Sequence, residues 1–353
     1  MDSSPRIQYF LGANSPSGFY SLYHELLPAE QARSIYILKG GPGCGKSTLM
    51  RRVAALAEEA GETVEYILCS GDPDSLDAIV LPQKQIALVD GTAPHVVEPK
   101  YPGLVEQYVN LGACYQKDGL QSIRQELMSC MKGYKGCYQR AYRCLGAAAE
   151  IFEDMRCTLL TDQLEDRLAK RAKGILQREV PRRKNVSPGA VRQRFLGAVT
   201  HQGVLCLTQT AQVQCSKIFE LSDRWGLAHG LLSHLLAGAV NNGYDVVACP
   251  DPMAPDRLAH LLVPELELAF LTAQGLEDPY RRLRLDGAVD EILLRKNRSQ
   301  LRFAQKVHTA LVEEAVHSLT QAKEMHDQLE GLYNPYVDFG LVEKTARQIF
   351  EEL

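Results

Sequence analysis

Residues 40–48 carry glycines, a lysine and two hydroxyl groups at a spacing suited to binding a chain of phosphates. The run Gly-Gly-Pro-Gly-Cys-Gly-Lys-Ser-Thr fits G-x-x-x-x-G-K-S/T without a gap. Glycines let backbone N–H groups surround a phosphate without side-chain collision. Lys46 can then reach the β- and γ-phosphates of a nucleotide, while the Ser47 hydroxyl binds Mg²⁺. The predicted nucleotide-binding residues are Gly40, Gly41, Pro42, Gly43, Cys44, Gly45, Lys46, Ser47 and Thr48.

A second candidate is the aspartate that ends the apolar run Ile-Ala-Leu-Val-Asp at residues 86–90. This is a Walker B pattern, in which Asp90 holds Mg²⁺ directly or through water. Lys46 and Asp90 are therefore the predicted catalytic residues, and Ser47 and Asp90 the predicted metal ligands. The alternative is a buried strand that merely ends in an aspartate.

The residues after Asp90 leave the position of an attacking water undecided. Many ATP-hydrolysing proteins place a glutamate next to the aspartate, but this chain continues Gly-Thr-Ala-Pro-His. Thr92, His95 and Glu98 are nearby candidates for positioning water. For His95 a simple place in the turn that leaves the strand is the alternative reading.

The sequence around these residues predicts the elements of an α/β domain. A short apolar run at 35–39 predicts a strand directly before the loop, and a helix is expected from Leu49 to about Ala60, ending at Gly61. Another strand is expected at 63–68. The aspartates that follow it, Asp72, Asp74 and Asp77, should lie on the same edge of a parallel sheet as the loop, where they either contact ligand or cap turns.

An internal repeat predicts two units of similar fold. The offset between matching segments falls only from 185 to 183 to 182 along the chain. The matching segments are 10–13 with 195–198, 35–38 with 218–221, 61–64 with 243–246, 73–76 with 255–258, and Pro82 with Pro264. We therefore expect residues 1–185 and 186–353 to form two P-loop-like units with mainly parallel sheets, each followed by a helical arm at about 118–180 and 288–353.

The second copy lacks the chemistry of the phosphate loop. It reads Asp-Arg-Trp-Gly-Leu-Ala-His-Gly over residues 223–230. The alignment places His229 opposite Lys46, Gly230 opposite Ser47 and Thr272 opposite Asp90. Asp223 brings negative charge to the place where phosphate would bind, and Trp225 brings bulk. The second unit is therefore predicted to be degenerate, with His229 in a structural role.

Each arm carries apolar residues at alternating spacings of three and four, which predicts a long helix packed along a partner. The first seam is Leu120, Ile123, Leu127, Cys130, Tyr134, Cys137, Ala141, Cys144, Ala148, Ile151 and Met155. The second, weaker seam is Leu301, Ala304, His308, Leu311, Ala315, Ser318, Ala322, Met325 and Leu329. Shorter helices at roughly 162–178 and 341–352 are expected to fold back as hairpins. The arms are also the candidate surface for a protein partner.

Residues 167–194 join the two units and are rich in basic side chains. These are Arg167, Lys170, Arg171, Lys173, Arg178, Arg182, Arg183, Lys184, Arg192 and Arg194. Without aromatic residues between the charges, a solvated helix face and linker is favoured over a nucleic-acid site, which stays open as an alternative.

Composition narrows the class of protein. The 353 residues are 45% apolar and 23% charged, with a net charge of −4, as in soluble globular proteins. There is neither a signal-peptide pattern at the start nor an apolar run long enough for a transmembrane helix, so no membrane contact is expected. The ten cysteines have no zinc-finger spacing, which favours a reducing, cytoplasmic compartment.

The chain resembles an uncharacterised bacterial ATPase family with tandem P-loop domains. The resemblance rests on residues 10–14, residues 38–48, and Asp-Gly-Thr-Ala-Pro-His at 90–95 with Glu98 and Pro99. It covers most of the chain and implies a P-loop NTPase fold with ATP as the ligand. In this family the second loop can also be intact, and the present chain departs from that pattern.

Three functions remain open on these grounds. The first is an Mg²⁺-dependent ATPase or ATP-driven switch that uses one intact loop. The second is a small-molecule kinase, suggested by the missing glutamate and the acidic residues near the loop. The third is a non-hydrolysing, nucleotide-binding interaction protein, suggested by the lost second site and the helical seams.

Overall fold

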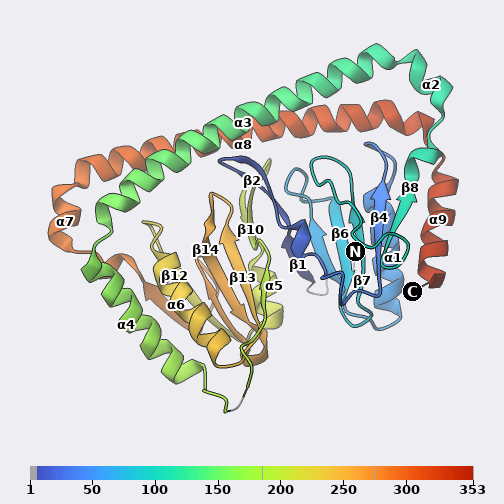
Figure 1. Cartoon of the computed structure of the whole chain (residues 1–353). Helices are drawn as coiled ribbons and strands as arrows, with labels where there is room; N and C mark the ends of the chain where they lie inside the picture. The colour runs from blue at the N-terminus through green and yellow to red at the C-terminus, as the bar shows by residue number, and fades with distance from the viewer. Residues whose placement is uncertain (1–5, 185, 274, 353) are drawn as a thin grey trace.

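The computed structural model describes residues 6–184, 186–273 and 275–352 and has an α/β architecture with two six-stranded sheets. Figure 1 shows the sheets next to each other, with a pair of long helices running along both. Residues 1–5, examined above for a signal peptide, and residue 185, at the expected boundary between units, lie outside the described residues.

The first sheet places the strand before residues 40–48 in its interior. In spatial order its strands are β1 (Ile7–Phe10), β5 (Glu65–Leu68), β6 (Leu76–Leu81), β7 (Ile86–Asp90), β4 (Ser34–Lys39) and β8 (Glu106–Asn110). β6 runs antiparallel to both of its neighbours, whereas the other pairings are parallel. β4 and β7 are fully paired, with Leu38 opposite Asp90. The expected strands at 35–39, 63–68 and 86–90 are confirmed.

The second sheet repeats this arrangement strand by strand. Its order is β9 (Val191–Gln193), β13 (Val246–Asp251), β14 (Ala254–Val263), β15 (Leu268–Leu271), β12 (Lys217–Ser222) and β16 (Arg281–Arg284). Here β14 is the reversed strand. A hairpin accompanies each sheet, β2 (Gly12–Ser15) with β3 (Gly18–Ser21) and β10 (Gly197–Thr200) with β11 (Gly203–Cys206).

Helices α1 (Lys46–Glu59) and α6 (Ala228–Asn241) follow β4 and β12, and each has 14 residues. In α1 the buried residues recur every three or four positions, which gives the helix one apolar face toward the sheet. The remaining short elements are η1 (Tyr23–Glu25), η2 (Leu111–Cys114), α5 (Thr208–Gln214), η3 (Pro264–Leu266) and η4 (Asp286–Ala288). We refer below to β1–β8 with α1 as the first unit and to β9–β16 with α5 and α6 as the second unit.

The units meet through equivalent residues. Phe10 and Phe195 exchange two backbone hydrogen bonds, each of 2.9 Å. The buried Arg194 guanidinium binds the Glu65 carboxylate at 2.6 Å and the Glu25 carbonyl at 2.6 Å. A buried ion pair with its donors satisfied fixes the relative position of two surfaces more than it adds stability.

The two long arm helices pack on each other in antiparallel fashion. They are α3 (Arg124–Leu159) and α8 (Arg298–Tyr333), each of 36 residues. Cys130 near the start of α3 donates to the Met325 carbonyl near the end of α8, while Gln300 near the start of α8 donates to Asp154 near the end of α3. The partner that the apolar seams predicted is therefore the other arm of the same chain.

The short helices at the ends of the arms are confirmed at the expected positions, but they do not fold back on their own arms. α4 (Asp162–Glu179) packs on α6 of the second unit, where Leu164 and Leu168 share one core with Leu231. α9 (Phe339–Glu352) packs on α1 of the first unit. α3 and α8 each run along both units (Figure 1). Therefore α4, which comes after the first unit in the chain, packs on the second unit, and α9, which comes after the second unit, packs on the first. Two further short helices, α2 (Lys117–Ser122) and α7 (Glu291–Lys296), begin the arms, and η5 (Asn334–Tyr336) joins α8 to α9.

Several basic side chains of residues 167–194 are already used within the chain. Arg167 and Arg171 donate to the carbonyls of Ala288 and Arg284, and Arg183 lies over the Tyr244 ring. With Arg194 buried as well, this stretch offers less free positive charge than its sequence suggests.

None of the helices in the described ranges combines the length and apolarity needed to span a bilayer.

Candidate functional site

Residues 40–48, the first loop, connect β4 to α1 in the conformation that the sequence predicted. Gly43 and Gly45 have φ angles of +70° and +81°, in the left-handed region that favours glycine. α1 begins at Lys46, directly after the left-handed Gly45. The loop therefore presents its backbone N–H groups at the positive end of a helix, which is an arrangement that binds anions.

The Lys46 ammonium lies inside this loop. Its Nζ donates to the carbonyl oxygens of Gly40 at 2.8 Å and Gly41 at 2.9 Å, and it lies 3.5 Å from Oδ2 of Asp90. The side chains of Lys46 and Asp90 are only 12% and 13% exposed. The two predicted catalytic residues are thus brought together, Lys46 from the start of α1 and Asp90 from the end of β7, although neither contact requires a nucleotide.

The two predicted metal ligands lie on the same edge of the sheet. Ser47 Oγ accepts a hydrogen bond of 3.0 Å from the Leu76 amide, which orients the hydroxyl. Asp90 Oδ1 accepts from the amide and the hydroxyl of Thr92, while Oδ2 faces Lys46. Thr92 therefore positions Asp90, and its hydroxyl is occupied by that contact.

The first loop is covered by the arm of the second unit, a feature that the sequence did not predict. The Gly43 amide donates to Oε1 of Glu330 on α8 at 3.3 Å, and the Asn334 amide reaches the Gly43 carbonyl at 3.1 Å. Phe339 and Val342 lie next to Gly45. A carboxylate thus occupies one of the N–H groups through which such a loop binds phosphate.

The aspartates between β5 and β6 divide into two kinds. Asp72 forms the turn, accepting from the amide of Asp74 and the hydroxyl of Ser75 at 3.3 and 2.9 Å. Asp77 lies within β6 and is buried. β6 and β7 are antiparallel and Ala78 pairs with Val89, so the preceding residue Asp77 lies opposite Asp90. Burial raises the pKa of the Asp77 carboxyl.

His95 and Glu98, two candidates for positioning water, have different surroundings. His95 is buried with Nε2 3.4 Å from Oδ1 of Asp77, and its ring lies against Phe19 and Tyr23. Glu98 is exposed and pairs with Lys39 at 2.9 Å and with Tyr108. His95 therefore belongs to the interior next to the loop, and Glu98 to its rim.

Residues 223–230, the second loop, keep the shape of the first but not its chemistry. Gly226 has the same φ of +70° as Gly43. Asp223 fills the loop: its carboxylate accepts from the amides of Trp225 at 3.3 Å, Leu227 at 2.8 Å and Ala228 at 2.6 Å. The amides that would meet a phosphate are thus already bonded to a carboxylate of the same loop.

The structure corrects the alignment of the second loop by one residue. His229 Nδ1 accepts from the Leu258 amide at 3.1 Å, which is the contact that Ser47 makes with Leu76 in the first unit. α6 begins at Ala228 as α1 begins at Lys46. The loop is therefore one residue shorter, so Ala228 replaces the lysine and His229 replaces the serine. His229 has the structural role that was expected.

The second loop is covered by the other arm. Phe152 of α3 packs so closely on Gly226 that a Cβ there would fall 2.7 Å from its ring. Arg257 donates to the Gly226 carbonyl at 2.6 Å and pairs with Glu153 of α3 at 3.2 Å. Each loop is therefore in contact with the long helix that follows the other unit.

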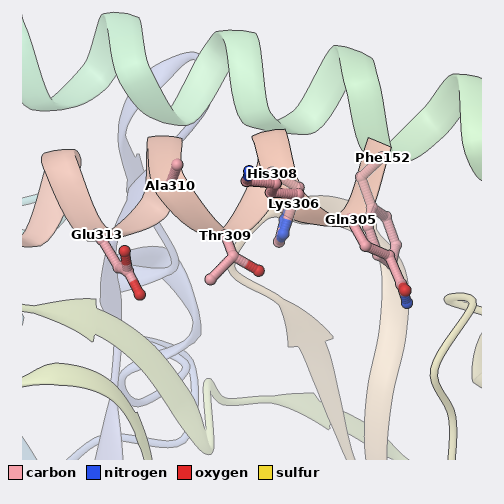
Figure 2. A pocket seen from close by; sticks show the side chains of 7 residues that line it. All are labelled: Phe152, Gln305, Lys306, His308, Thr309, Ala310 and Glu313. Carbon is pink, nitrogen blue, oxygen red and sulfur yellow. The ribbon is translucent and has the colours of Figure 1, made fainter. Parts of the chain in front are cut away.

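A cavity of about 590 Å³ lies along α3 and α8, away from the first loop. Figure 2 shows its lining side chains, which come from α8 except for one from α3. They are Phe152, Gln305, Lys306, His308, Thr309, Ala310 and Glu313. The cavity contains none of the residues predicted to bind nucleotide or metal, and it does not define the site.

Comparison with known proteins identifies one similarity. Residues 21–171 match the family model of the N-terminal part of nephrocystin 3. The matched segment runs from the end of β3 into α4, includes the first loop and Asp90, and is less than half of the chain. The chain shows no significant similarity to a curated protein or to a solved structure.

Proposed function

We propose that this chain is an Mg²⁺-dependent ATP-binding protein that hydrolyses ATP, or switches with it, through the first loop alone. The observation that carries the proposal is the convergence of Lys46 and Asp90, 3.5 Å apart, at a glycine loop that opens a helix. Each residue type has a place in phosphoryl chemistry: amides and lysine for phosphate, hydroxyl and carboxylate for Mg²⁺.

The roles of the individual residues follow from charge. Lys46 leaves the Gly40 and Gly41 carbonyls to bind the β- and γ-phosphates, and it stabilises the negative charge that develops there. Ser47 and Asp90 contribute oxygen ligands to Mg²⁺, an ion that prefers such ligands. Thr92 keeps the Asp90 carboxylate in place.

We also propose that the two units are P-loop NTPase-like copies that arose by duplication. The identical order and direction of the strands, the left-handed glycine in both loops and the paired Phe10 and Phe195 support this origin. The second copy does not bind nucleotide in this proposal, because Asp223 occupies its amides and Ala228 replaces the lysine.

The contact between Glu330 and Gly43 favours a switch. A phosphate chain in the first loop competes with the Glu330 carboxylate for the Gly43 amide, since both are anions. Binding of nucleotide therefore changes the contact of α8 with the loop, and α8 packs along α3, which contacts the second loop.

A nucleotide-binding protein that does not hydrolyse ATP is the second candidate. The same cover over the first loop favours it, together with the absence of an acid beside Asp90 in the sequence.

We propose the cytoplasm as the compartment, because ten free thiols are typical of a reducing environment.

The test is phosphate release from ATP in the presence of Mg²⁺, with Lys46→Ala as the variant. We expect release by the wild type and a loss of at least about 100-fold in the variant, as for removal of a group that stabilises transition-state charge. His229→Asn in the second loop is the matched control and should retain activity. Tight ATP binding without release supports the second candidate, whereas neither binding nor release contradicts both.

A further inference from the structure

Three side chains with metal-binding atoms converge next to the first loop. They are Cys69, which follows β5, Asp77 at the start of β6, and His95, which follows β7. Their ligand atoms all lie within 4.8 Å of one another, and Asp77 and His95 are buried. The antiparallel course of β6 brings its first residues to the edge at which β5 and β7 end, so the fold itself assembles the cluster.

Within the described residues, some polar atoms of the cluster have partners, but one atom of the histidine does not. The Nδ1 atom of His95 is buried and has no hydrogen-bond partner among the described residues. Asp77 accepts a hydrogen bond from the Tyr23 hydroxyl and lies next to His95. Burying a carboxyl, a thiol and an imidazole together costs free energy unless an ion or a hydrogen-bond network compensates it.

We propose that Cys69, Asp77 and His95 bind a divalent transition-metal ion of borderline softness, such as Zn²⁺. Sulfur, nitrogen and oxygen are the ligand atoms that Zn²⁺ takes in proteins. Zinc bond lengths in a tetrahedral site place ligand atoms roughly 3.2–3.8 Å apart. The 3.4 Å between His95 Nε2 and Asp77 Oδ1 falls within that spacing, and the Cys69 sulfur lies within 4.8 Å of both ligand atoms, so it moves closer on binding.

The surroundings of the cluster fit a metal site. The Tyr23 hydroxyl donates to Asp77 Oδ2 at 2.8 Å, which leaves Oδ1 for the ion and orients the carboxylate from outside. Phe19 and Tyr23 enclose the imidazole of His95. On binding, the Cys69 thiol releases its proton and the thiolate bonds to the metal. Three protein ligands leave a further position for water or another ligand.

This site is distinct in chemistry from the predicted Mg²⁺ site, although the two are neighbours. Mg²⁺ takes oxygen ligands, which Ser47 and Asp90 supply, whereas a thiol and an imidazole select a softer ion. The inference does not rest on the proposed function, because it requires neither nucleotide nor Mg²⁺.

The test is the binding of Zn²⁺ or Co²⁺ to the full chain after chelation, in buffer without nucleotide. We expect about one tightly bound ion per chain, and with Co²⁺ a sulfur-to-metal charge-transfer band from the thiolate. Cys69→Ser should abolish that band, and His95→Ala should lower the affinity for Zn²⁺ at least about 10-fold.

Two variants are matched controls. Cys137→Ser changes another partly buried cysteine, which lies against Met325. His326→Ala removes a member of the cluster His326, Asp327 and Glu330 on α8, the second group among the described residues whose atoms lie close enough to hold an ion. Both should bind Zn²⁺ as the wild type does. Absence of the charge-transfer band in the wild type, which needs no variant to fold, overturns the proposal. So does unchanged Zn²⁺ affinity in Cys69→Ser.

Discussion

The two loops of this chain share a backbone and differ in what fills it. Gly43 and Gly226 have the same left-handed φ, and each loop joins an interior strand to a helix of equal length. In the first loop one amide is bonded to Glu330, which comes from a distant helix. In the second loop three amides are bonded to Asp223, which belongs to the loop itself.

The difference shows that the same loop shape can hold a carboxylate from a distant helix or one from the loop itself. An anion is held in both cases, because a helix N-terminus with free amides requires an acceptor. The Glu330 carboxylate is held on its loop amide by one hydrogen bond of 3.3 Å, whereas Asp223 accepts three hydrogen bonds within its own loop. We therefore interpret the first loop as a site from which a ligand can displace the Glu330 carboxylate. We interpret the second loop as a purely structural connection between β12 and α6.

The largest effect is expected when the lysine is moved between the loops. Lys46→Ala should lower ATP turnover by about 10²–10³-fold, since the charge on the transferring phosphate loses its counter-ion. Ala228→Lys should bring no ATP binding to the second loop, because Asp223 remains on the amides. Phosphate release measures the turnover of Lys46→Ala, and radiolabelled ATP binding measures whether Ala228→Lys gains a site. Binding gained by Ala228→Lys in a Lys46→Ala background would refute the difference that we assign to the loops.

The second expected effect is a pH dependence specific to the second unit. His260 occupies the position of Ala78, and burial lowers its pKa to about 4. The unfolded chain, with a histidine pKa near 6.5, binds the proton between pH 6.5 and 4 while the folded chain does not, so stability falls as the pH falls through this range. From pH 7 to pH 5 the loss is about 2 kcal/mol.

Urea unfolding followed by the fluorescence of Trp225 measures that loss, because this single tryptophan lies in the second loop. His260→Gln should flatten the pH profile between pH 5 and 7. A profile that is equally steep in the variant would show that other groups titrate there.

The third prediction concerns the closure of the second loop. Asp223→Ala removes the acceptor of three amides, two of them next to α6, and should lower the free energy of unfolding by about 1–2 kcal/mol, as for the loss of a helix cap. Trp225 fluorescence again reports the transition. Asp286→Ala, which removes the acceptor of the Arg224 amide alone, is the control and should cost less. Equal costs would mean that Asp223 has no special role.

The smallest effect is expected at the cover of the first loop. Glu330→Ala removes the carboxylate that competes with phosphate and should tighten ATP binding by about 3–10-fold, the equivalent of one partly exposed hydrogen bond to a charged group. Glu324→Ala, an exposed acid on the same helix, should leave affinity unchanged. Calorimetric titration with ATP and Mg²⁺ measures both, and weaker binding by Glu330→Ala would mean that the carboxylate assists the nucleotide.

The local elements could be predicted from the sequence, because their signals are local. Strand, glycine loop and helix at 34–59 follow from apolar runs and left-handed glycines, and the long helices follow from their seams. The position of β6 could not be predicted, because Asp77 interrupts its apolar run and lies just after a turn, so the sequence places Asp77 in a turn or at the edge of the sheet.

Contacts between distant segments could not be predicted from the sequence for a different reason. Nothing in the order of residues indicates that Glu330 reaches Gly43, or that α4 and α9 cross to the other unit, because the seams specify an apolar partner but not which one. The one-residue shortening of the second loop was misplaced for a similar reason. The sequence permits either alignment, whereas the start of α6 and the hydrogen bond from the Leu258 amide to His229 distinguish them.

The central claim is that one loop binds ATP and the other does not, and the stoichiometry of binding tests it most directly. Calorimetric titration of the wild type with ATP and Mg²⁺ should give one site per chain, and Lys46→Ala should remove that site. Two sites per chain, or a single site that survives in Lys46→Ala, would contradict the account.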